Sequence, residues 1–166
     1  KRIAMDAHAL GEGVGPQAEK IATALRRDMG LNQRQAGALG RYESTLEQQG
    51  LAQRQIDQQV ADYRDRMIDS RARLIARHET LTGSHVGQQE VWTQAREQGL
   101  LDVDQKRVWI TQPGLNSDNP CPICKPMNGQ VRGLNEAFVS PYDGSSALQP
   151  PIHVACECDT SLYFED

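Results

Sequence analysis

The chain has 166 residues, of which 38% are hydrophobic and 5% aromatic. This length suffices for one domain, or for a helical region and a small second unit, but the apolar content is low for a well-filled core. The formal net charge is −4, and from Cys121 to the end there are two basic and six acidic residues. Strong DNA binding is therefore disfavoured, because nucleic-acid binders carry clustered basic residues. The sequence has neither an apolar run of membrane-spanning length nor a signal-peptide core, so we expect a soluble, non-secreted chain with reduced thiols.

Apolar periodicity predicts about four helices in the first hundred residues, one of them long. Pro16 begins the first helix, which ends at Gly30, and the second spans Asn32–Gln49 with Asn32 as its N-cap. The third carries the clearest apolar stripe, which we interpret as packing against another helix or a partner chain: Ile56, Val60, Tyr63, Met67 and Leu74. The fourth spans Gln88–Gln98 and ends at Gly99.

The pattern changes at "KRVWIT", where β-branched and aromatic residues predict a strand. Short strands are also predicted at Gln130–Gly133 and Cys156–Phe164, among many prolines and glycines. The fold class is therefore α+β, with helices in the first hundred residues and a small, loop-rich β unit at 101–166. Such a small unit with few large apolar side chains needs a further stabilising element.

All four cysteines lie in two clusters that predict this element to be a metal site. Cys121 and Cys124 form a C-x2-C pair, and His153, Cys156 and Cys158 follow about 30 residues later. Two thiolates at this spacing, closed by a distant second pair, are typical of structural zinc sites. Five candidates compete for four positions, and we favour Cys121, Cys124, His153 and one or both of the last two cysteines. A disulfide framework, a redox C-x2-C and unrelated buried thiols are the alternatives.

The order of these motifs resembles the phage Mu F-like head morphogenesis domain, over about Ser70–Leu162. A helix containing "ARHET" is followed by "KRVW", "CPICKPMNGQV", "EAFVSP" and "PPIHVACEC". The positions that match the family pattern are Arg77, Glu79, Lys106 or Arg107, Trp109, Cys121, Cys124, Gly129, Phe138, Pro151, His153, Cys156 and Cys158. The chain departs from the family in His78, where Thr is frequent, and in Glu157, which replaces the commoner arginine of Cys-Arg-Cys and adds negative charge beside the predicted metal.

The resemblance implies that an N-terminal helical region at 1–69 precedes a Mu F-like domain at 70–166, which has helices at 70–100 before the β unit stapled by zinc. It also implies a non-enzymatic minor capsid protein of a tailed phage or prophage, which binds the portal protein or the major capsid protein in the phage head. Assistance in genome packaging or ejection would follow from that location. The alternative is a zinc-containing effector or hydrolase of phage origin that uses Arg77, Glu79 and His85, and a third interpretation is a zinc-dependent module that contacts DNA.

Overall fold

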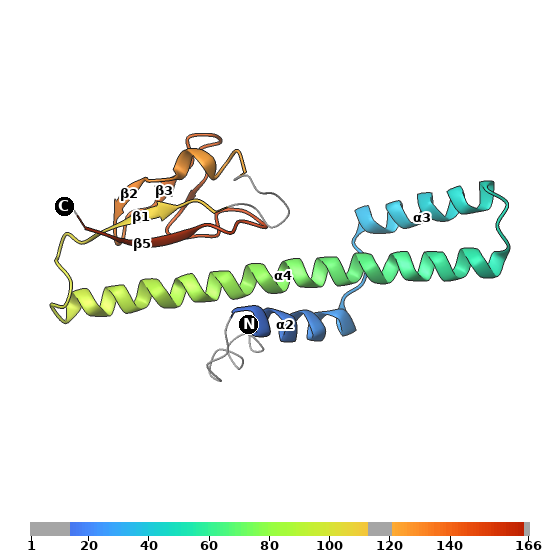
Figure 1. Ribbon diagram of the computed structural model, residues 1–166, viewed down its shortest axis with the longest axis horizontal. Coiled ribbons are helices and arrows are strands. Elements are labelled where there is room, and N and C mark those ends of the chain that lie inside the picture. Colours follow the sequence, from blue (N-terminus) through green and yellow to red (C-terminus); the bar gives the residue numbers. More distant parts are fainter. Residues whose placement is uncertain (1–13, 113–120, 165–166) are drawn as a thin grey trace. The chain divides into compact units, whose positions relative to one another are not determined.

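The computed structural model describes residues 14–112 and 121–164, and the described chain is α+β, as predicted (Figure 1). Three α-helices precede two small antiparallel sheets and a short 3-10 helix. Their bounds are α2 Val14–Asp28, α3 Gln33–Gln48, α4 Gln53–Glu97, β1 Lys106–Ile110, η1 Lys125–Met127, β2 Val131–Gly133, β3 Phe138–Val139, β4 Ser146–Ala147 and β5 Asp159–Tyr163. The chain divides into two compact units between Ala76 and Arg77, inside α4. No helix of the described residues has the length and apolar character needed to cross a membrane.

The prediction of four helices was wrong for the described residues, because the expected third and fourth helices are one continuous helix of 45 residues. The sequence suggested a break between these helices at "LTGSH". This segment contains no proline, the residue that interrupts a helix because it lacks the backbone N–H donor and its ring clashes with the preceding turn. Gly83 costs about 1 kcal/mol relative to alanine in a helix but does not end one. Thr82 fits the helix, since its hydroxyl donates to the carbonyl of His78 one turn earlier.

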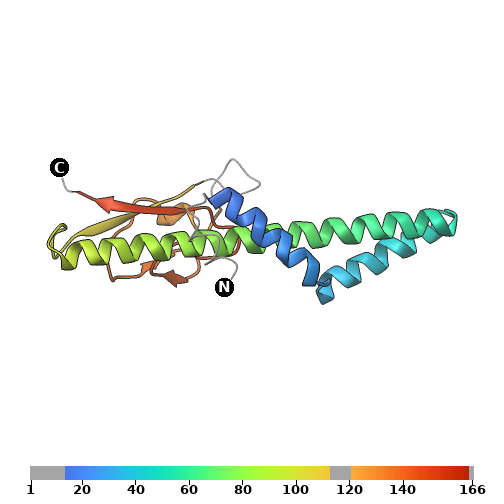
Figure 2. The same ribbon diagram turned by 90° about the horizontal axis from the view of Figure 1, so that it is seen from below.

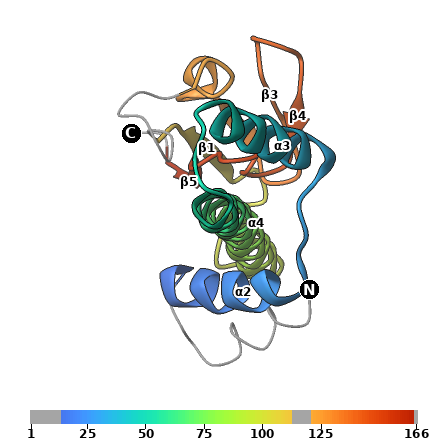
Figure 3. The same cartoon turned by 90° about the vertical axis from the view of Figure 1, so that its right-hand side faces the viewer.

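The first unit contains α2, α3 and the beginning of α4. Asn32 caps α3 as predicted, in a capping box with Gln35, and Gly50 follows the helix with a φ of 72°. Figure 3, which looks nearly along α4, shows α2 and α3 on opposite sides of that helix. Figure 2 shows α2 crossing α4 obliquely, and the small side chains of Ala72 and Ala76 are buried in this contact.

The second unit begins at Arg77 and contains the rest of α4 and both sheets. β1 is the central strand of a three-stranded sheet in the order β2-β1-β5, and β3 pairs with β4. The three predicted strands therefore form, although β5 begins at Asp159 and leaves Cys156 and Cys158 in the preceding loop. Trp109 of β1 lies opposite Thr160 of β5 and is fully buried. The core of this unit is consequently centred on β1.

Helix α4 also contributes side chains to the second unit. Gln88 Nε2 donates to the carbonyl of Thr160 at 3.3 Å, and Gln89 Nε2 donates to the carbonyl of Leu134 at 2.6 Å. These two amides satisfy backbone acceptors of the C-terminal segment, so the second half of α4 is part of the same packed unit.

Candidate metal centre

Two loops of the second unit bring together the five residues predicted as metal ligands. Cys121 and Cys124 lie in the turn before η1, and His153, Cys156 and Cys158 lie in the loop before β5. Three of the cysteines are buried, with exposed fractions of 2 to 3%, while Cys121 and His153 are half-buried. All four cysteines are free thiols, so the disulfide framework considered above does not form here.

The donor atoms form two groups that share Cys124. Cys121, Cys124 and His153 form one group, and Cys124, Cys156 and Cys158 form the other; within each group the donor atoms lie within 4.8 Å of one another. His153 Nε2 lies 3.0 Å from both Cys121 Sγ and Cys124 Sγ, and Cys124 Sγ lies 3.7 Å from Cys156 Sγ. Sulfur atoms bound about 2.3 Å from a tetrahedral ion are about 3.8 Å apart, so the last distance suits a shared ion. The cluster can hold a metal ion.

The ring of His153 is oriented as a metal ligand requires. Its Nδ1 lies 2.7 Å from the carbonyl oxygen of Val154, which can only accept, so Nδ1 carries the proton and donates. Nε2 is therefore the ring nitrogen that faces the two sulfur atoms, and in the neutral ring it presents its lone pair to them. A hydrogen bond from the second ring nitrogen to a carbonyl is the usual way in which proteins orient a ligating histidine.

Local backbone geometry presents the sulfur atoms of both loops. The amide of Cys124 donates to Cys121 Sγ at 3.3 Å, and the amide of Lys125 donates to the carbonyl of Cys121 at 2.9 Å, which closes the first turn. In the second loop the amide of Cys156 donates to the carbonyl of His153 at 3.2 Å, and Ala155 has a φ of 62°. A non-glycine residue in this conformation is strained and is retained where the surrounding structure requires the turn.

The electrostatics of the cluster favour a cation. Burial and the neighbouring sulfur atoms raise the pKa of Cys124, and the hydrogen bond with Cys156 together with burial raises that of Cys158. The thiol of Cys158 and backbone amides lower the pKa of Cys156 to about 5, against the effect of burial. Burial opposes the shift at Cys121, but backbone and side-chain hydrogen bonds from Cys124 lower its pKa. The pKa shifts of the four cysteines thus have opposite signs, because ionisation of one thiol disfavours ionisation of its neighbours.

Large, buried hydrophobic side chains pack against the cysteines. Trp109, Met127 and Phe138 are fully buried against them, and the rings of Trp109 and Phe138 meet edge to face with centroids 5.2 Å apart. Thr111 Oγ1 donates to the carbonyl of Cys124 at 2.8 Å and anchors the first turn to β1. The cluster and the hydrophobic core are therefore one structure, and its position depends on both.

An ion pair that the sequence analysis did not predict lies beside the cluster. Arg77 of α4 forms a bidentate ion pair with Glu157, with 2.6 Å between Nε and Oε1. Glu157 lies between Cys156 and Cys158 in the sequence. This pair raises the pKa of Arg77, an effect that burial opposes. The negative charge that Glu157 adds to the motif is thus balanced by Arg77. Eighty residues separate the partners, and no local pattern in the sequence links them.

The three residues considered for the alternative, an effector or hydrolase, are in separate environments. Arg77 is engaged by Glu157, Glu79 is exposed, and buried His85 places Nδ1 3.5 Å from a carboxylate oxygen of Asp159. Neither Glu79 nor His85 belongs to a cluster of potential metal ligands in the described part of the chain.

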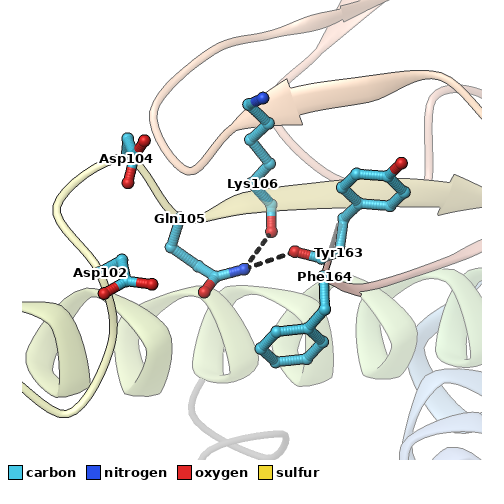
Figure 4. A pocket seen from close by; sticks show the side chains of 6 residues that line it. All are labelled: Asp102, Asp104, Gln105, Lys106, Tyr163 and Phe164. Carbon is cyan, nitrogen blue, oxygen red and sulfur yellow. Dashed lines mark hydrogen bonds between the residues drawn. The ribbon is translucent and has the colours of Figure 1, made fainter. Parts of the chain in front are cut away.

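A further cavity, of about 260 Å³, opens at the other end of the β1–β5 pair (Figure 4). Gln105 lines it, and its Nε2 donates to the carbonyls of Lys106 and Tyr163 at 2.9 and 2.7 Å. The carboxylates of Asp102 and Asp104 stand at one side of it. No cysteine or histidine lines this cavity, so it is separate from the metal centre.

Fold and site together define an α+β protein with one long helix and a buried Cys/His cluster that can hold a metal ion. No protein-family model, no curated protein and no solved structure matches the chain.

Proposed function

We propose that the cluster binds one zinc ion as a structural element of the second unit. Cysteine sulfur and histidine nitrogen are the donors that zinc prefers, whereas magnesium and calcium require oxygen. Cys121, Cys124 and His153 would hold the ion with Cys156 or Cys158. With four protein ligands the ion stabilises the fold and has no open position for a catalytic water.

The observation that carries this proposal is the arrangement around His153. A ring nitrogen aimed at two sulfur atoms, with the opposite nitrogen bound to a carbonyl, is an arrangement that metal ligation explains. The alternative of unrelated buried thiols does not explain why a histidine nitrogen faces two of the sulfur atoms. A redox C-x2-C is also disfavoured, because the second pair of cysteines is packed against the first.

We further propose that the protein is a minor head protein of a tailed phage or prophage. Two observations support this proposal: the family-like order of the motifs, and the contact of two of these motifs, "CPIC" and "HVACEC", in one buried cluster. In this role the zinc centre gives a rigid end to a protein that binds the portal or the major capsid protein. The virion would be its location, and genome packaging or ejection the process that it assists.

The effector or hydrolase alternative gains no support from the described residues. Arg77 pairs with Glu157, and neither Glu79 nor His85 belongs to a cluster of potential metal ligands among the described residues. We therefore propose a non-enzymatic role. Direct DNA binding gains none either, since the C-terminal segment is acidic.

Two experiments test these proposals separately. Metal analysis of the protein purified under reducing conditions should find about one zinc per chain, and a preparation without bound metal that is nevertheless fully folded would refute the zinc proposal. For the phage role, the chain should co-purify with portal protein or procapsids when it is produced with phage head components. Failure of the two to associate, with each of them folded, would argue against a head protein.

A further inference from the structure

A groove on the first unit lies along a face of α4 that α3 leaves uncovered. It has a volume of about 570 Å³, and its lining includes the side chains of Tyr63, Met67, Leu74 and Ile75. This volume lies within the usual range of about 300 to 1,000 Å³ for binding clefts, and the groove has room for a few large side chains of a partner. All of these residues belong to the first unit.

The groove exists because α3 is shorter than the apolar stripe of α4. The two helices are antiparallel: Tyr42 contacts Tyr63 with ring centroids 4.7 Å apart, and Gln35, in the first turn of α3, donates to the carbonyl of Met67. Beyond Met67 the stripe continues to Leu74 with no part of α3 opposite it. Helix α2 packs elsewhere on α4, around Ala72 and Ala76, and does not cover this face. The apolar stripe predicted from the sequence is therefore only partly used.

The charged residues that line the groove are both arginines. Arg66 is exposed and stacks on the ring of Tyr63 with a distance of 5.8 Å to its centroid, and Arg71 donates to the carbonyl of Gly30. No carboxylate lines the groove, and neither arginine has an ion pair among the described residues. Asn32 also lines the groove and marks the N-terminal end of α3, where the helix dipole adds positive potential. The positive charge of the lining thus favours an occupant with acidic side chains.

We propose that this groove binds an acidic amphipathic helix of a partner protein. The apolar positions from Tyr63 to Leu74 span about 16 Å of α4, the length of three helical turns. An occupying helix would present apolar side chains at i, i+3 or i+4 and i+7 to Met67 and Leu74, with glutamate or aspartate beside Arg66 and Arg71. This inference deepens the proposed function, on which it rests for the identity of the partner as a phage head component, but the groove itself is independent of the zinc centre.

The test uses the full chain and a designed probe. The probe is a fluorescent 15-residue helical peptide with leucine at i, i+4, i+7 and i+11 and glutamate on its flanks, and its counterpart carries lysine in place of every glutamate. Fluorescence anisotropy should show binding of the glutamate peptide and none of the lysine peptide at matched concentrations. Arg66→Glu should weaken binding of the glutamate peptide roughly tenfold, because the charge reversal replaces attraction with repulsion at the contact.

The control is Arg64→Glu, an identical change two residues away on the same helix, at an exposed side chain that lies outside the groove. This variant should bind the glutamate peptide within twofold of the natural chain. Equal binding of both peptides, equal effects of the two substitutions, or no binding at all would overturn the proposal. If sedimentation shows a dimer that Arg66→Glu dissociates, the occupant is a second copy of this chain and the proposal of a foreign helix is wrong. Zinc content and procapsid association are not read out here, so failure of this test is distinguishable from failure of the proposed function.

Discussion

Unfolding of the second unit should depend on the concentration of free zinc. A ligand that binds only the folded state stabilises it by RT ln(1 + [L]/Kd), which is about 2.7 kcal/mol when free zinc is 100 times its Kd. The second unit runs from Arg77 to Asp166. For a unit of about that size each kcal/mol moves the unfolding midpoint by about 4 to 8 °C, so the shift should be roughly 15 °C. The helices of the first unit should unfold at a midpoint that zinc leaves unchanged.

Tryptophan fluorescence is the assay, because the chain has two tryptophans and one of them is in the core beside the cluster. In a Trp92→Phe background Trp109 is the only tryptophan and is excited selectively at the red edge of the absorption band. Thermal unfolding is then followed at a series of buffered zinc concentrations under reducing conditions. His153→Gln should remove the zinc dependence of the midpoint. The matched control is His78→Gln in the same unit, outside the cluster, which should keep that dependence. A midpoint that is constant across the zinc series, in a chain that is folded at each concentration, would refute the reasoning.

Three further predictions concern single interactions. Arg77→Ala and Glu157→Gln should show a coupling energy of about 1 kcal/mol in a double-mutant cycle of urea unfolding, since the pair is bidentate but Arg77 is 41% exposed; coupling within error of zero would contradict the pair. Asn32→Ala should destabilise the first unit by about 1 kcal/mol through loss of the capping box, without changing the zinc-dependent transition; an unchanged helical transition in circular dichroism would count against the cap. Hydrogen bonds from the hydroxyl and the amide of Ser145 lower the pKa of Asp143 below the ordinary value of 3.8. These bonds therefore stabilise the folded chain fully above pH 3.8, and their contribution is lost as the pH falls through the lowered pKa of the folded state. An NMR titration should find this shift, with Ser145→Ala reducing it, and a pKa at or above 3.8 would exclude it.

Much of the local structure was predictable because its causes are local. The cap at Asn32, the glycine that follows α3 and the strand at "KRVWI" are each specified by a few neighbouring residues. The five residues of the Cys/His cluster were also predictable, since a C-x2-C pair followed by a distant His-Cys-Cys group is a spacing typical of metal sites.

The length of α4 was not predictable in the same way. The two predicted helices were separated by a threonine-glycine segment of weak helix propensity, and propensity is a weak guide when packing supplies most of the stability. Packing of Gln88 and Gln89 against the C-terminal segment stabilises the continuous helix. The start of β5 was missed for a related reason, because residues 156–158 belong to the cysteine loop instead of the ladder.

The sequence by itself determined the α+β class, most helix and strand positions, and the residues of the Cys/His cluster. Only the tertiary structure decided which nitrogen of His153 faces the sulfur atoms, that Arg77 neutralises Glu157, and that α3 stops short of Leu74 and leaves a basic groove. The physical reason is distance along the chain. A cap or a ligand spacing is set within a few residues, whereas an ion pair between residues 80 apart, or the length of one helix against another, depends on how the whole unit packs.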